Sequence, residues 1–155
     1  MVGMFRLVVN ALAECELDCV LSVGSDFDGD LGSFLPGNFR LNREASHLEI
    51  LPHAALAISH GGMLTTLEAL YNGVPSLMIP SHPGAEEVAY RAAELGLGIR
   101  LRMEEATKKT IRASVERLLR DSRMLEGVRQ ARNAFRASGG ASEAADRIEQ
   151  AFRFR

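Results

Sequence analysis

Residues 58–70 of the chain read ISHGGMLTTLEAL, a short apolar run that is broken by two glycines and then resumes with helical spacing. The run suits a buried parallel strand, and Gly61 and Gly62 suit a tight backbone turn. The apolar residues after the turn recur at positions that share one face of a helix. The stretch therefore predicts a strand, a turn and a helix in direct succession.

This turn has the residue types of an anion site. Free N–H groups at the start of a helix, together with the positive end of its dipole, attract phosphate groups. Gly61 and Gly62 let a ligand approach the backbone, His60 can donate a hydrogen bond, Thr65 adds a hydroxyl group, and Glu68 follows one turn later. The set fits a nucleoside diphosphate. The alternatives are that His60 is a structural residue at a strand end and that Glu68 is a helix-surface carboxylate.

The segments around this unit alternate between strand and helix signals. Further strands are predicted over residues 19–23, 39–41, 76–79 and 98–101, and helices over residues 3–14, 44–51, 85–95, 104–120, 122–136 and 141–154. Such alternation predicts an α/β fold with a Rossmann-like parallel sheet and helices on both faces. We expect the last three helices to pack on the sheet. At 155 residues the chain is most simply one domain.

Composition argues against several functional classes. Eighteen basic and twenty acidic residues give a net charge of −2, with no basic footprint for nucleic acid. No run is long and apolar enough for a membrane span, and the start lacks a secretory signal, so the sequence predicts a cytoplasmic protein. Cys15 and Cys19 are too few for a disulfide framework and are expected to be buried thiols where a helix meets a strand.

Two metal hypotheses are weak. Asp26, Asp28 and Asp30 alternate as in a calcium loop, but Leu31 and Gly37 stand where that loop needs its glycine and its glutamate. A solvated acidic loop is the better interpretation. The histidines outside the glycine turn lack the close spacing of a zinc pair, so loop or capping roles are expected for His47, His53 and His82. The sequence predicts no metal site.

A wider pattern surrounds the glycine turn. It comprises Pro52–Gly62, Thr65, Glu68–Leu70, Gly73–Pro75, Pro80, Ala89 and Glu94–Gly96. This pattern resembles the C-terminal, donor-binding domain of nucleotide-sugar glycosyltransferases with the GT-B fold. The bacterial enzymes that glycosylate macrolides, aromatic polyketides and other natural products are the most similar. The resemblance covers nearly the whole chain and implies transfer of a sugar from a nucleoside diphosphate to an acceptor hydroxyl.

The resemblance also implies a role for each part of the site. The diphosphate would lie against His60, Gly61, Gly62, Leu64 and Thr65, and Glu68 would bind the ribose hydroxyls. The base would lie against Ala45, Ser46 and His47, and the sugar against Gly84, Ala85 and Glu86. A nucleotide sugar is then the substrate, and no metal or other cofactor is implied.

Some residues depart from the family pattern. Ser46 and His47 replace a proline and a glutamine, which puts base recognition in doubt. Gly84 and Ala85 replace an aspartate and a glutamine that hold the sugar hydroxyls in the family. A deoxysugar donor would explain this loss, and so would loss of donor use. A non-catalytic nucleotide-binding module that partners another chain is therefore the alternative function.

The resemblance also sets expectations for what lies outside these 155 residues. The acceptor site and its general base belong to an N-terminal domain in the family, so no catalytic residue is expected here. The first strand of the donor domain would precede Met1. The chain is then expected to be a fragment or one half of a split enzyme, and the sheet edge left uncovered would favour self-association.

Overall fold

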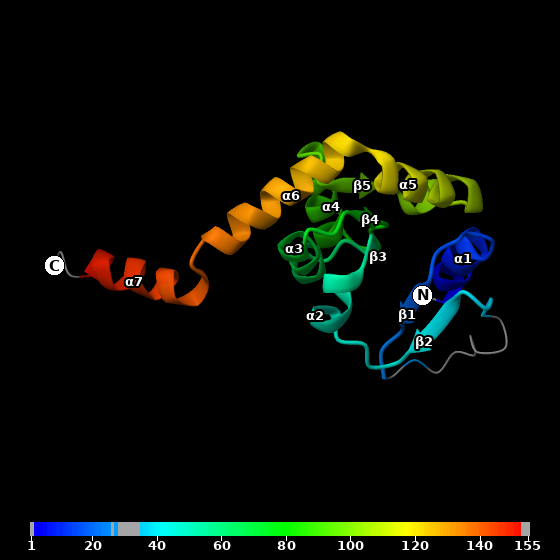
Figure 1. Ribbon diagram of the computed structural model, residues 1–155, viewed down its shortest axis with the longest axis horizontal. Helices are drawn as coiled ribbons and strands as arrows, with labels where there is room; N and C mark the ends of the chain where they lie inside the picture. The colour runs from blue at the N-terminus through cyan, green and yellow to red at the C-terminus, as the bar shows by residue number, and fades with distance from the viewer. Residues whose placement is uncertain (1, 26, 28–34, 153–155) are drawn as a thin grey trace.

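The computed structural model describes residues 2–25, 27 and 35–152. Its strands form two parallel sheets (Figure 1). β1 (Cys19–Ser22) pairs with β2 (Phe39–Asn42), while β3 (Ala57–Ser59), β4 (Ser76–Met78) and β5 (Gly98–Arg100) form the second sheet in that order. The predicted α/β class is confirmed, with the difference that the strands divide between two sheets. Asp26, Asp28 and Asp30 of the predicted acidic loop lie outside the described residues.

The helices follow the expected order along the chain. They are α1 (Val2–Leu12), α2 (His47–Ile50), α3 (Met63–Asn72), α4 (Pro83–Glu94), α5 (Lys108–Arg120), α6 (Ser122–Ala137) and α7 (Gly140–Phe152), with the short 3-10 turns η2 (Leu51–His53) and η3 (Met103–Glu105). Cys15 follows α1 and Cys19 is the first residue of β1, and both are free thiols that are half-buried rather than buried as expected. Burial raises the pKa of the Cys19 thiol, so this cysteine forms thiolate less readily.

The three-stranded sheet is covered on both faces. Successive residues of a strand point to opposite faces, and on β4 these are Leu77 and Met78. Leu77 belongs to a buried cluster that includes Ile111 of α5, whereas Met78 packs with Ala89 of α4. Both β4 side chains are fully buried. This strand is therefore the centre of the core, and helices lie on either side of it as the sequence predicts.

The central strand–turn–helix unit has the predicted boundaries. β3 leads through the glycine turn into α3, and α3 ends at Gly73, which has a left-handed φ of 75°. The Gly73 amide donates to the Leu70 carbonyl at 2.9 Å, and the Val74 amide donates to the Ala69 carbonyl at 2.9 Å. These bonds satisfy the last carbonyl groups of the helix, and a glycine adopts the required backbone without strain.

The segment predicted as one helix over residues 104–120 is divided in the structure. η3 ends at Glu105, and α5 begins only after Thr107, whose hydroxyl accepts from the Thr110 amide at 3.1 Å. The Thr110 hydroxyl in turn accepts from the Thr107 amide at 2.9 Å. This reciprocal capping box fixes the start of α5. The prediction of an unbroken helix is therefore wrong in its first turn.

The last two helices extend away from the sheets. α6 packs along α3, whereas none of the residues of α7 is buried. Figure 1 shows α7 continuing beyond α6, far from β1 and β5. The expectation that all three C-terminal helices pack on the sheet is wrong for α7, and α6 packs chiefly on the helices α3 and α5. In the described part of the chain, no helix combines the length and apolar composition needed to cross a membrane.

Asp121 connects α5 to α6 and caps the start of α6. Its carboxylate accepts from the Met124 amide at 3.1 Å, and this bond, aided by Arg117 and opposed by desolvation, lowers the pKa of the carboxyl group. A carboxyl with a lowered folded-state pKa stabilises the fold above its ordinary pKa of about 4. This stabilisation is lost as the pH falls through the lowered value.

We therefore expect wild-type stability to decrease more between pH 5 and pH 3 than that of Asp121→Asn. Asparagine also caps a helix but does not titrate. The measurement is the urea concentration at half-unfolding for both proteins at each pH. Parallel pH profiles for the two proteins would show that the Asp121 cap has no part in acid sensitivity.

Candidate functional site

The candidate site lies at one edge of the three-stranded sheet. Because β3, β4 and β5 are parallel, their carboxyl ends meet at the same edge. His60 follows β3, His82 follows β4, and Arg100 is the last residue of β5. Ligands of open α/β sheets bind outside the carboxyl ends of the strands. The sequence-predicted diphosphate residues are thus at the edge where a ligand is expected.

Gly61 makes the turn between β3 and α3 possible. Its φ is 76°, a left-handed conformation that costs other residues about 1 kcal/mol or more. A Cβ atom added there would lie 3.2 Å from the Cβ atoms of both Ala89 and Met78. The Gly61 amide donates to Ser59 Oγ at 3.1 Å. The turn is therefore held tightly between the sheet and α4, which fixes where α3 begins.

The N-terminus of α3 is open. Gly62 occupies the N-cap position and has no side chain to accept a hydrogen bond from the first turn. Within the described residues, no group accepts from the amides of Met63, Leu64 or Thr65. Three N–H groups and the positive end of the helix dipole are thus available to one anion. This is the geometry that a phosphate group requires.

The His60 ring lies over this opening. A Cβ atom built on Gly62 would be only 2.5 Å from His60 Nε2, so the ring occupies the space directly above the N-cap. His60 is exposed to solvent and faces the site rather than the core. A ligand oxygen at the first turn of α3 can therefore meet both the helix amides and the imidazole.

We expect Gly62→Ala to displace the His60 ring without unfolding the chain. The backbone of Gly62 has φ −62° and ψ 145°, which alanine adopts freely. Affinity for a nucleoside diphosphate should fall about tenfold, the equivalent of one hydrogen bond to a charged group. Calorimetric titration and thermal unfolding measure the two effects.

The matched control for this substitution is Gly127→Ala in α6. A Cβ atom at Gly127 would lie 3.6 Å from the Gly96 carbonyl oxygen, an ordinary contact away from the start of α3. Its affinity should stay close to that of the wild type. Equal affinities for wild type and Gly62→Ala would mean that the position of the His60 ring does not matter for binding.

The predicted ribose and base residues meet on the outer side of α3. His47 Nδ1 of α2 lies 3.1 Å from Glu68 Oε2 of α3. Glu68 is three residues after Thr65, so the two side chains share a helix face. His47 thus has a side-chain partner rather than the loop or capping role expected. The other base candidates, Ala45 and Ser46, immediately precede α2, and Ser46 makes no side-chain cap bond.

The three predicted sugar residues lie in the first turn of α4 and differ in whether they have a group that can bind a sugar hydroxyl. Gly84 is exposed, whereas the Ala85 side chain is buried and its amide already donates to His82 Nδ1 at 3.2 Å. Glu86 is half-buried and forms an ion pair with Arg100. In this turn the Glu86 carboxylate is therefore the group that can accept from a sugar hydroxyl.

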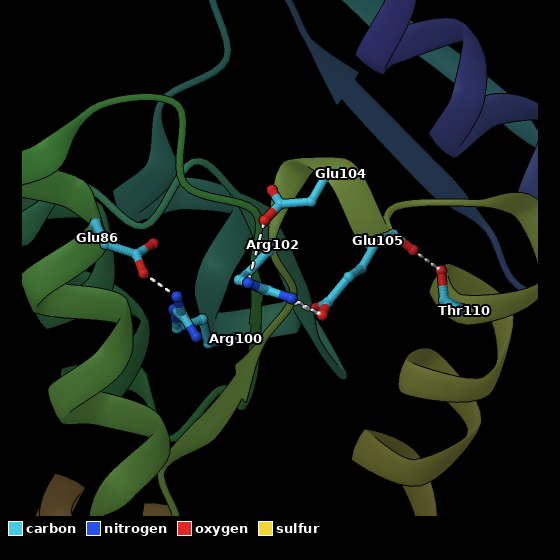
Figure 2. Close-up of polar contacts among 6 residues, drawn as sticks. All are labelled: Glu86, Arg100, Arg102, Glu104, Glu105 and Thr110. Atoms are coloured by element: carbon cyan, nitrogen blue, oxygen red, sulfur yellow. Dashed lines mark hydrogen bonds and ion pairs between the residues drawn. The ribbon is translucent and has the colours of Figure 1, made fainter.

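Figure 2 shows how Glu86 is held. The Arg100 guanidinium reaches from the end of β5 to the Glu86 carboxylate on α4, and this hydrogen bond raises the pKa of Arg100 further. Next along the chain, Arg102 pairs with Glu104 and Glu105. The Glu105 carbonyl accepts from the Thr110 hydroxyl at 2.7 Å. The Arg100–Glu86 pair ties β5 to α4, and the other contacts tie the end of β5 to η3 and α5.

His82, for which the sequence predicts a loop or capping role, is a further neighbour of the site. Its capping role is confirmed, since Nδ1 accepts from the Ala85 amide. Its ring also lies against the His60 ring, with 5.8 Å between centroids and 42° between planes. The sequence signal was the pair His82-Pro83 at a helix start, but its closeness to His60 depends on the packing of β4 beside β3.

Other parts of the described structure are weaker candidates for a metal-binding or ligand-binding site. No three His, Cys, Asp or Glu side chains in residues 2–25, 27 and 35–152 are arranged to hold a metal ion. A hollow of about 500 Å³ lies at the far end of α4, lined in part by Leu95, Arg117, Asp121 and Gln130. Its Arg117 is already paired with Asp121. This hollow has no uncapped helix start comparable to that of α3.

Comparisons with known proteins agree with the fold. NDP-glycosyltransferase YjiC of Bacillus licheniformis is 34% identical over 145 residues, which is 94% of this chain and 37% of that protein. Demethyllactenocin mycarosyltransferase of Streptomyces fradiae is 36% identical over 148 residues, which is 95% of this chain and 32% of that protein. The chain thus spans about a third of the length of these relatives.

Solved structures give the same result. The calicheamicin glycosyltransferase CalG4 superposes with a TM-score of 0.88 at 34% identity, and the match covers 96% of this chain and 39% of that one. The family described as "Erythromycin biosynthesis protein CIII-like, C-terminal domain" matches residues 6–151. The chain therefore belongs to this family of glycosyltransferase C-terminal domains.

Proposed function

We propose that this chain is the donor-binding half of a glycosyltransferase that transfers a sugar from a nucleoside diphosphate to an acceptor hydroxyl. The observation that carries the proposal is the uncapped start of α3 beneath the His60 ring, with Glu68 one turn further along. The name of one relative, an NDP-glycosyltransferase, supports the nucleoside diphosphate as the leaving group.

In this proposal each part of the nucleotide meets a group of the described chain. The diphosphate accepts from the amides of Met63, Leu64 and Thr65 and from His60. The ribose hydroxyls donate to Glu68, whose second carboxylate oxygen, Oε1, has no partner among the described residues. The base lies against residues 45–47 of the segment that leads into α2.

The same groups would also assist the reaction. Negative charge grows on the diphosphate as the bond to the sugar breaks. Fixed N–H donors that point at this charge stabilise the transition state more than the ground state. The acceptor hydroxyl would attack with inversion, and its general base would come from an N-terminal domain or a partner chain. We expect no turnover by this chain alone.

The proposal places the protein in the cytoplasm, with a nucleotide sugar as substrate and no further cofactor. Self-association of the chain through an uncovered edge strand stays a prediction.

A second candidate is a non-catalytic nucleotide-binding module that partners another chain. The observation that favours it is the first turn of α4. Gly84 has no side chain, Ala85 is buried, and Glu86 is already bound to Arg100. A module of this kind would bind the nucleotide, and the sugar would add little to the affinity.

The test is calorimetric titration of the chain with UDP, dTDP and GDP, followed by the matching nucleotide sugar. Micromolar binding of one nucleotide is expected, and tighter binding of its sugar derivative would favour the donor domain over the module. Equal binding with and without the sugar would favour the module. Absence of binding to all three by a folded chain would overturn both candidates.

A further inference from the structure

His82 carries a donor group that the proposed function leaves unused. It stands between β4 and α4, beside His60, and both rings are exposed to solvent. Two exposed imidazoles whose centroids are 5.8 Å apart can contact one ligand together. The hydrogen bonds of the His82 ring determine which of its two nitrogens can donate to that ligand.

The N-cap hydrogen bond of α4 determines the tautomer of His82. His82 Nδ1 accepts a hydrogen bond from the Ala85 amide at 3.2 Å, so this nitrogen carries a lone pair and no proton. The proton of a neutral imidazole then resides on Nε2. Nδ1 also faces Gly84, since a Cβ atom there would lie 3.6 Å away. The helix start thus holds His82 in the tautomer that offers Nε2–H as a donor.

The surroundings of His82 favour an anion as the acceptor. On the side of β3, His60 Nε2 lies next to Gly62, the N-cap residue of α3, and the three amides that follow Gly62 are free. On the side of α4, the first turn points its positive dipole end at the same edge of the sheet. Glu86 is the acidic group of this turn, and Arg100 neutralises it. An anion that reaches both helix starts therefore meets two imidazole donors.

We propose that His82 is a second diphosphate-binding residue, which donates from Nε2 to the phosphate nearest the sugar. The inference rests on the proposed function and deepens it. His82 caps the start of α4, where the sugar candidates lie, whereas His60 lies next to the N-cap of α3, where the nucleotide candidates lie. A diphosphate that spans the two helix starts would have its nucleoside-linked phosphate at α3 and its sugar-linked phosphate at His82.

The test separates this role from capping by means of His82→Ser. A serine hydroxyl caps a helix as histidine does here but cannot reach the neighbouring ligand. We expect the unfolding temperature to stay unchanged. Affinity for the preferred nucleoside diphosphate should fall about tenfold or more, while affinity for the corresponding monophosphate should stay the same. His82→Asn caps and also offers an N–H group, so it should recover part of the loss.

The titrations of the wild type and His82→Ser separate the inference from the proposed function. If the wild type binds no nucleoside diphosphate, the proposed function fails and this inference fails with it. If the wild type binds but His82→Ser binds the diphosphate equally well, the inference alone is wrong. Equal losses for diphosphate and monophosphate would also overturn it, because a contact to the sugar-linked phosphate cannot affect a ligand that lacks this phosphate.

Discussion

His60→Ala is expected to bind its preferred nucleoside diphosphate about 10- to 100-fold more weakly than the wild type. The imidazole lies directly over the start of α3, where an anion would also meet the free amides of Met63, Leu64 and Thr65. Loss of the ring removes one donor to a charged group and opens the site to water. Calorimetric titration gives the dissociation constants.

His53→Ala is the matched control for this substitution. His53 is also an exposed histidine, but it ends the η2 turn before β3 rather than facing the start of α3. Its variant should bind as the wild type does. If His60→Ala retains full affinity, or if both variants lose it equally, the imidazole of His60 has no specific part in binding.

Leu77→Ala is expected to lower the free energy of unfolding by about 2–5 kcal/mol. Leu77 is at the middle of the central strand β4 and is fully buried in the cluster that joins the strands to α5. Truncation leaves a cavity that the strands on either side cannot close without breaking their pairing. A loss of this size is a large part of the stability of a typical domain.

Urea unfolding of Leu77→Ala and Leu48→Ala gives the comparison. Leu48 is on the surface helix α2 and is 65% exposed, so its truncation should change stability by no more than about 0.5 kcal/mol. Equal, small effects in the two variants would contradict the position of β4 at the centre of the core.

The sequence predicted the central unit well because its signals are local. An apolar run, two adjacent glycines and a later Asn72-Gly73 each act within a few residues, and the structure has β3, the turn and the end of α3 where they indicate. The start of α5 was misplaced for the same reason. The charged residues of η3 suit a helix, and only the reciprocal Thr107–Thr110 capping box shows where the helix begins.

Two features of the site depend on packing between distant segments and were not predictable from the sequence. His47 and Glu68 are 21 residues apart, and α2 must lie across α3 before they meet. The contact between His60 and His82 likewise requires β3 and β4 to pair in one register. Sequence patterns named the residues of a candidate site but could not show which of their side chains touch.

NMR tests most directly whether the nucleotide binds at the start of α3. Amide spectra of the ¹⁵N-labelled chain would be recorded during titration with the nucleotide that binds in calorimetry. The largest shifts are expected at the Gly61, Gly62, Met63, Leu64 and Thr65 amides, with smaller shifts around Glu68. Shifts confined to the hollow near Arg117 and Gln130, with the start of α3 unchanged, would contradict the proposed site.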